Sequence, residues 1–186
     1  MSTSALFGAI LAFMLMLSPA HALEDEWSAG GGLVLASIPS QENGVMGVGG
    51  LAKLRYGLDD AFALGLSVLY SHHFAAAGSE ADPDGAGPME VIVPRLGLSY
   101  AIDILELVPW VELDLGCYFA GEQLLEEADW GFGASISLGL EYRRWRSTAL
   151  GVQLGYHAFF QHLDQYPAYV HFALTASWIS DPFDFD

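Results

Sequence analysis

Residues 130–142, with the sequence WGFGASISLGLEY, place a large apolar side chain at almost every second position and mostly Gly or Ser between them. Successive side chains of a β-strand point to opposite faces, so this alternation predicts a strand with two unlike faces. The Gly and Ser face lacks the Lys, Glu and Thr expected on the exposed face of a soluble sheet. We therefore predict that the apolar face contacts lipid and that the other face lines a narrow interior.

Seven further segments show the same alternation, and no helical period of comparable length competes with it. The eight predicted strands are residues 27–37, 45–56, 61–73, 89–101, 110–120, 130–142, 148–160 and 168–178. Each is about as long as the ~9–11 residues that a tilted strand needs to cross a bilayer. The sequence thus predicts an all-β fold, an eight-stranded antiparallel up-and-down transmembrane β-barrel.

The connections between these segments alternate in character. Residues 57–60 and 143–147 are tight turns and 102–109 is a somewhat longer one, whereas 38–44, 75–88, 121–129 and 162–167 are polar loops that contain Gly or Pro. Outer-membrane barrels have short periplasmic turns and longer outer loops. This order predicts that the first strand runs outward and that both termini lie in the periplasm.

The first residues of the chain predict export. An apolar run within residues 5–22 ends in Ala20-His21-Ala22, a small-x-small cleavage site, although residues 2–10 contain no Lys or Arg. We expect residues 1–22 to be a cleavable signal peptide and residues 23–186 to form the barrel domain, located in the outer membrane. A retained anchor helix is the alternative, which the run disfavours because it is shorter than the ~20 residues of a spanning helix.

Charge and cysteine content exclude several classes of function. The 23 acidic and 6 basic residues give a net charge of −17, which argues against a basic surface for nucleic acid. The only cysteine, Cys117, excludes an internal disulfide and lies far from a lipoprotein cleavage site. The acids cluster in the predicted loops and ends, where they could bind divalent cations bridging to lipopolysaccharide or keep the surface hydrated; we expect hydration.

Aromatic residues gather near both ends of the predicted strands, as the girdles of membrane barrels do. The predicted periplasmic belt consists of Trp27, Tyr56, Phe62, Tyr100, Trp110, Tyr142, Trp145 and Trp178. The predicted outer belt consists of Tyr70, Phe74, Phe119, Trp130, Phe159 and Tyr166. A soluble secreted barrel or sandwich with scattered aromatics is the alternative, and agreement among eight strands favours the membrane barrel.

With these features the chain resembles the small eight-stranded outer-membrane barrels of Gram-negative bacteria, of the OmpA membrane-domain and OmpX kind. The resemblance covers residues 27–178 and includes turns such as YGLDDAFALGLSVLY and LSYAIDILELVPWVELDLG. In that family the last strand commonly ends in an aromatic residue that the assembly machinery recognises. Here FALTASWIS is followed by the acidic tail DPFDFD, so that residue is Trp178 or Phe185.

The interior face carries charges of both signs. We predict a lumen ion-pair network of Lys53, Arg55, Arg95, Glu112, Asp114 and Glu141. Counting back from the turn at 102–109 places Ala101 opposite Trp110 and lets Arg95 reach Asp114 diagonally. Buried charges in so narrow a barrel are stable when paired, so we interpret the network as structural rather than catalytic or conducting.

Histidines are the other candidates for chemistry. His72, His73, His157, His162 and His171 fall in the outer half of the predicted barrel. A last hairpin that closes symmetrically would place His157 directly opposite His171, both pointing inward. Paired imidazoles can bind a transition metal, but two ligands are few, so His157 and His171 are weak metal candidates and hydrated lumen residues are the expected alternative.

Two other functions compete with a structural or surface-interaction role. A lipid-A-modifying enzyme needs a nucleophile, a base and an acid together, whereas Ser71 and His72 are strand neighbours on opposite faces and no acid is expected beside them. An OmpW-like conduit for small hydrophobic molecules needs an apolar lumen, which the charges contradict. We therefore expect a monomer without a cofactor that contacts outer-membrane lipid, lipopolysaccharide and, during biogenesis, the barrel assembly machinery, but no nucleic acid.

Overall fold

The computed structural model describes residues 24–39, 45–74, 88–102, 106–121, 129–145, 147–160 and 168–180. They form eight strands: β1 (Trp27–Ile38), β2 (Val45–Gly57), β3 (Phe62–His73), β4 (Met89–Ala101), β5 (Leu107–Gly121), β6 (Asp129–Trp145), β7 (Thr148–Phe159) and β8 (Tyr169–Ile179). The described residues include no helix that is long and apolar enough to span a membrane. The predicted signal peptide and the acidic tail at 181–186 lie outside the described residues.

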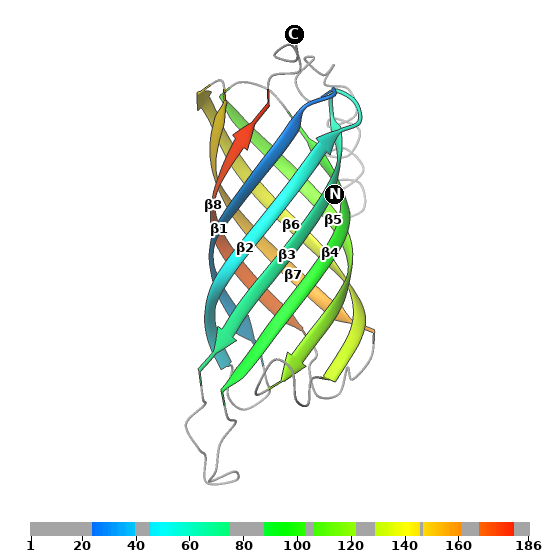
Figure 1. Cartoon of the computed structure of the whole chain (residues 1–186), viewed down its shortest axis with the longest axis vertical. Coiled ribbons are helices and arrows are strands. Elements are labelled where there is room, and N and C mark those ends of the chain that lie inside the picture. The colour runs from blue at the N-terminus through cyan, green and yellow to red at the C-terminus, as the bar shows by residue number, and fades with distance from the viewer. Residues whose placement is uncertain are drawn as a thin grey trace, which may run out of the picture.

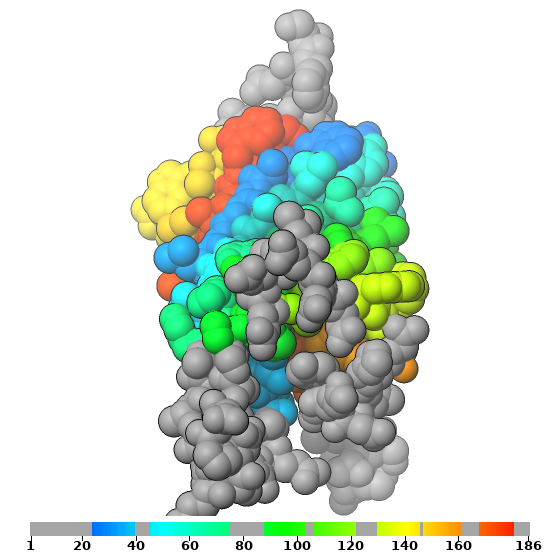
Figure 2. Space-filling model, turned by 60° about the horizontal axis from the view of Figure 1, so that its bottom comes forward, coloured from blue at the N-terminus to red at the C-terminus, as the bar shows by residue number. Residues whose placement is uncertain are grey.

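Each strand pairs antiparallel with the next in sequence, and β1 pairs with β8 to close the barrel. Figure 1 shows the tilted strands, with β8 in red beside β1 in blue. In the space-filling view β1 again lies between β8 and β2 on the surface (Figure 2). This closed up-and-down barrel confirms the predicted fold.

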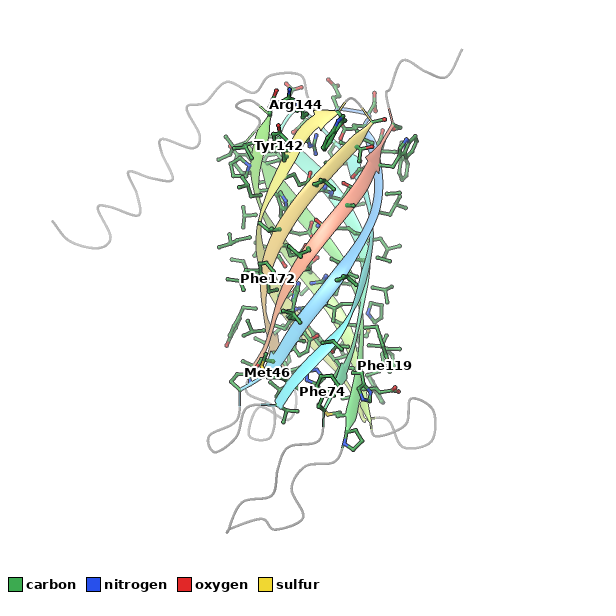
Figure 3. The ribbon with its side chains drawn as sticks, turned by 90° about the vertical axis from the view of Figure 1, so that its left-hand side faces the viewer. Met46, Phe74, Phe119, Tyr142, Arg144 and Phe172 are labelled. Atoms are coloured by element: carbon green, nitrogen blue, oxygen red, sulfur yellow. The ribbon has the colours of Figure 1, made fainter. Side chains whose placement is uncertain are left out.

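The predicted alternation appears directly in the burial of side chains. On β6, Leu138 is 56% exposed and Ile136 44%, whereas Ser137 and Ser135 between them are 0% and 5% exposed. Figure 3 shows the side chains that project from the outer surface of the wall, among them Phe172 at mid-height. The outer surface is therefore apolar, and the small or polar residues between face the lumen.

The first strand begins, and the last strand ends, at the same end of the barrel. β2 and β3 are joined there by residues 58–61, and β6 and β7 by residues 146–147. The same end holds the start of β1 and the end of β8, because Trp27 donates its backbone N–H to Ser180 Oγ at 2.9 Å. β1, β3, β5 and β7 end at the opposite end, which we call the loop end because the sequence predicts the longer loops there; we call the first the turn end.

Two strand boundaries differ from the sequence prediction by three residues, and the others agree with it to within one residue. β5 begins at Leu107 instead of residue 110, since Val108 and Pro109 still pair with β6. β6 continues to Trp145, so most of the turn predicted at 143–147 is strand. Both strands are longer because backbone pairing continues past the point where the side-chain alternation becomes unclear.

Most of the predicted belt residues face outward. At the turn end Trp27, Phe62, Trp145 and Trp178 are 39–56% exposed, and at the loop end Tyr70, Phe74, Phe119 and Trp130 are 37–57% exposed. The prediction was wrong for Trp110, which is 6% exposed and lies in the lumen. It was also wrong for Phe159, whose ring packs 4.5 Å from that of Tyr118 inside the barrel. Both residues lie near an end of the barrel, as belt residues do, but the alternation of the strand turns their side chains inward. Tyr166, the remaining predicted belt residue, lies outside the described residues.

Candidate functional site

The lumen contains a layer of ion pairs between mid-barrel and the turn end. Lys53 Nζ on β2 lies 2.6 Å from Glu112 Oε2 on β5, although the pair lacks hydrogen-bond geometry. Arg55, also on β2, donates to Glu141 on β6. These partners belong to strands that are not neighbours in the wall, so both pairs cross the lumen.

The third predicted pair joins adjacent strands. Ala101 pairs with Trp110 and Gly97 with Asp114, as the sequence predicted. Arg95 Nη1 lies 3.6 Å from Asp114 Oδ2, and the two side chains are 0% and 1% exposed. None of the Arg95 nitrogens has a hydrogen-bond partner among the described residues, whereas Asp114 accepts a bond of 3.0 Å from Ser135 Oγ. The structure therefore brings all six predicted residues into the lumen as three ion pairs.

Three residues extend this layer beyond the prediction. Arg143 lies 3.1 Å from Glu141 and 3.2 Å from Glu26, which continues the ion pairs to the turn end. The Trp110 ring lies 4.3 Å from Lys53 Nζ, close enough for a cation–π contact. Arg143 and Trp110 could have been found from sequence, because each shares the strand parity of a predicted lumen residue two positions away.

A second layer nearer the loop end consists of rings and hydroxyls within an apolar shell. The shell includes Val34, Leu51, Leu69, Val91 and Val93. Ser71 Oγ lies 3.0 Å from His73 Nε2 and 2.9 Å from the Tyr169 hydroxyl. The His157 ring packs edge-on against Tyr169, with centroids 4.9 Å apart. The loop-end half of the lumen is thus filled by side chains as well.

The two predicted histidines meet within this layer, but in a different register from the one predicted. His171 pairs with Gly155, and His157 pairs with Tyr169, so the prediction of a directly facing pair was wrong. The observed pairing of β7 with β8 is shifted by two residues from the symmetric hairpin assumed in the prediction. The rings still meet as diagonal neighbours, with His157 Nε2 2.8 Å from His171 Nδ1.

Hydrogen bonds define the protonated nitrogen of each ring. Gln153 Nε2 lies 2.8 Å from His171 Nε2 and must be the donor, because an amide nitrogen does not accept. Neutral His171 then carries its proton on Nδ1 and donates to His157, which donates from Nδ1 to the Tyr118 oxygen at 3.0 Å. The four residues form one directed chain, from Gln153 to Tyr118.

This chain uses all four imidazole nitrogens that could bind a metal. The described residues contain no group of three or more His, Cys, Asp or Glu side chains arranged to hold a metal ion. His157 and His171 therefore have no third ligand within the part of the chain that the structure describes. Of the histidines named from the sequence, His162 lies outside the described residues.

Gly155 makes room for this arrangement, which leads to a prediction. A Cβ at Gly155 would lie 2.6 Å from His171 Nδ1, so Gly155→Ala must displace the ring and break its bond to His157. We expect the free energy of unfolding to fall by about 1–3 kcal/mol, the usual range for overpacking. Urea titration in vesicles measures it. Gly50→Ala is the control, because its Cβ would meet only Gly32 O at 3.7 Å; an equal loss in both variants would contradict the steric explanation.

Two cavities adjoin the ion-pair layer, with volumes of about 10 and 20 Å³. Each has room for about one water molecule. The larger one is lined by Lys53, Arg55, Gln153 and Thr175, among others, so a water there would meet several polar groups. These spaces are far smaller than a small-molecule pocket.

The candidate residues for enzyme chemistry lie on opposite faces of β3. Ser71 is 0% exposed and faces the lumen, while His72 is on the outer face, as predicted. The expectation that no acid lies beside them was wrong: Glu90 Oε1 lies 3.7 Å from His72 Nδ1 and accepts a bond of 3.0 Å from the Tyr70 hydroxyl. Glu90 comes from β4, directly opposite His72, so only the strand register reveals the pair.

Comparison with known proteins places the fold among small outer-membrane barrels. No protein-family model matches the chain, and no curated protein matches it in sequence. Among solved structures, Neisserial surface protein A is similar with a TM-score of 0.60 at 11% identity, over 82% of this chain and 95% of that chain. The outer membrane protein OprG from Pseudomonas aeruginosa gives 0.59 at 11% identity, over 87% and 98%.

A third similar structure is Ail, the attachment invasion locus protein of Yersinia pestis, with a TM-score of 0.54 at 14% identity, over 85% of this chain and 100% of that chain. At these identities the likeness concerns the fold. The structural neighbours are thus small eight-stranded outer-membrane barrels, in agreement with the OmpA- and OmpX-like resemblance of the sequence.

Proposed function

We propose that the protein is an integral outer-membrane barrel whose lumen is closed by side chains and whose role is structural or in surface interaction. The observation that carries this proposal is the contrast between the two faces of the wall. Leu33, Leu115 and Leu113 are 62–76% exposed on the outside, whereas Arg95, Glu112 and Asp114 are 1–3% exposed on the inside. Such an exterior suits hydrocarbon, and such an interior is stable only when its charges stay paired.

The proposal assigns surface contacts to the acidic segments at the loop end. These segments, at 40–44, 75–87, 122–128 and 161–167, lie outside the described residues. The partners we propose are outer-membrane lipid, lipopolysaccharide and the barrel assembly machinery during biogenesis, with the protein as a monomer. Neisserial surface protein A and Ail, with the same fold, are named for surface and attachment roles, which supports a surface function without specifying it.

Cell fractionation with heat-modifiable gel mobility tests the location and the barrel together. A closed membrane barrel should sediment with outer membranes and change its mobility after boiling, because boiling opens the hydrogen-bonded wall. Recovery in the soluble periplasm with no change in mobility would refute the proposal.

A closed lumen predicts that the protein does not conduct. The ion pairs of Lys53, Arg55 and Arg95 occupy a barrel that side chains already fill, because eight strands enclose little more than that volume. Purified protein in planar bilayers should show no stable single-channel steps. Reproducible, ion-selective steps from the unmutated protein would favour a pore.

The lipid-A-modifying enzyme remains the alternative from another class. The outward His72 and Glu90 resemble a base with an orienting acid, but the hydroxyl of Ser71 lies on the opposite face and bonds to His73 and Tyr169. We therefore propose that the protein is not an enzyme. Mass spectrometry of lipid A from cells with and without the protein tests this, and a change in acyl chains that depends on His72 would reverse the conclusion.

The OmpW-like conduit has less support. Part of the loop-end lumen is apolar, but Leu69, Val93 and Tyr169 fill it at 0% exposure. The charged layer then separates this region from the turn end. A small hydrophobic molecule has no continuous apolar path through these described residues.

A further inference from the structure

The end of β6 contains an irregularity that changes which side chains face outward. Tyr142 pairs with Leu150 and Trp145 pairs with Thr148, so the two residues Arg143 and Arg144 stand opposite the single residue Ala149. This two-against-one count is a β-bulge. A bulge shifts the alternation by one position, so it re-aims the side chains that follow it.

The consequence is visible in where the side chains of Arg143 and Trp145 lie. Arg143 keeps the inward parity of Glu141 and pairs with it at 3.1 Å. In a strand without a bulge Trp145 would have the same parity and would point into the lumen. Instead Trp145 is 51% exposed, and its ring lies 6.1 Å from that of Tyr142.

Arg144 lies between these two aromatic residues in the sequence. It is exposed, and its Nη1 lies 3.5 Å from the Tyr142 hydroxyl oxygen, at the limit of a hydrogen bond. Figure 3 shows Arg144 and Tyr142 together at one end of the barrel, opposite the end that holds Met46. The other described cations, Lys53, Arg55, Arg95 and Arg143, each have a carboxylate within 4 Å, whereas no carboxylate of the described residues pairs with Arg144.

The chemistry of Tyr142, Arg144 and Trp145 points to a phosphate as the ligand. A guanidinium binds phosphate oxygens through a planar fork, and exposed Trp and Tyr rings are most stable at the depth of lipid headgroups. The turn end is the periplasmic end in the orientation that the sequence predicts, and the periplasmic leaflet consists of glycerophospholipids. The acidic protein, at net charge −17, would otherwise repel anionic headgroups.

We propose that Tyr142, Arg144 and Trp145 form a binding site for an anionic glycerophospholipid of the periplasmic leaflet, built by the β6 bulge. Arg144 binds the phosphate, and the rings of Tyr142 and Trp145 lie against the glycerol and upper acyl region. The inference rests on the proposed membrane location and deepens it, since it names one lipid contact of the barrel.

Native mass spectrometry of the folded protein tests this site directly. The detergent-solubilised protein is titrated with an equimolar mixture of phosphatidylglycerol and phosphatidylcholine that carry the same acyl chains. We expect phosphatidylglycerol to be retained about fivefold better, because one Arg near an anionic lipid contributes about that factor. Arg144→Gln should abolish the preference. Arg144→Lys should keep part of it, since Lys retains the charge but loses the fork.

Met46→Glu is the matched control, because it changes the net charge by the same amount at an outward position that is 57% exposed at the other end of the barrel. It should leave the preference unchanged. Equal losses in Met46→Glu and Arg144→Gln, or no preference in the parent, would overturn the site. Displacement of the lipid by inorganic phosphate would also overturn it, because the site would then hold free phosphate.

Failure of the membrane proposal is a separate result. A protein without heat-modifiable mobility would refute the barrel, and the lipid site with it, before any lipid is added. A barrel that shows the mobility change but no headgroup preference would refute the lipid site alone.

Discussion

Arg95→Ala should lower the free energy of unfolding by about 3–5 kcal/mol, the range for removing one partner of a buried ion pair. The side chains of Arg95 and Asp114 are 0% and 1% exposed, so Asp114 would be left without its cationic partner in a site that water hardly reaches. Its remaining bond to Ser135 Oγ, at 3.0 Å, stabilises the carboxylate only in part. Denaturant titration of the protein in phospholipid vesicles measures the loss.

Asp114→Asn in the Arg95→Ala background separates charge from lost packing. Removal of the unpaired carboxylate should recover part of the stability, because the amide carries no charge to desolvate. A loss below about 0.5 kcal/mol for Arg95→Ala alone would mean that water hydrates this pair, as at a surface ion pair.

Leu138→Arg should lower the free energy of unfolding by about 2–4 kcal/mol, the cost of a charge on the lipid face at mid-membrane. Leu138 is 56% exposed on the outer face near the middle of β6. Leu107→Arg is the depth control, since Leu107 is equally outward at 50% exposure but begins β5 at the turn end. Its cost should be only about 0–1 kcal/mol.

Ser137→Arg tests which face of β6 points into the lumen, whereas the pair above tests how deep a residue lies in the membrane. Ser137 is 0% exposed in the lumen, so an Arg there meets side chains and not hydrocarbon. A polarity-sensitive probe attached in turn at positions 132–140 should alternate between an apolar and a more polar environment. Equal costs at Leu138 and Leu107, or equal probe environments throughout, would contradict a lipid-facing alternation.

Features that depend on the two-residue alternation of side chains along a strand could be predicted from the sequence. The alternation along β6 assigned Leu138 outward and Ser137 inward because successive side chains of any strand point to opposite faces. Neighbouring strands joined by a turn also have a countable register, which placed Arg95 within reach of Asp114. The number of strands and the sign of each interior charge followed from the same local rules.

The tertiary structure decided everything that joins strands far apart in the wall or depends on a shift of register. Lys53 meets Glu112, and Arg55 meets Glu141, across the lumen, since closure and tilt bring non-adjacent strands to the same height. His157 and His171 meet diagonally because the last hairpin closes two residues away from symmetry.

The bulge between Tyr142 and Trp145 is the same kind of case. A single extra residue reverses the face of Trp145, and only backbone pairing with β7 reveals that residue. A period of two determines the face to which a side chain belongs, whereas register, tilt and closure determine its neighbours. The sequence by itself therefore determined a lipid-facing eight-stranded wall with a charged interior, and the closed barrel determined which charges, rings and exposed groups meet.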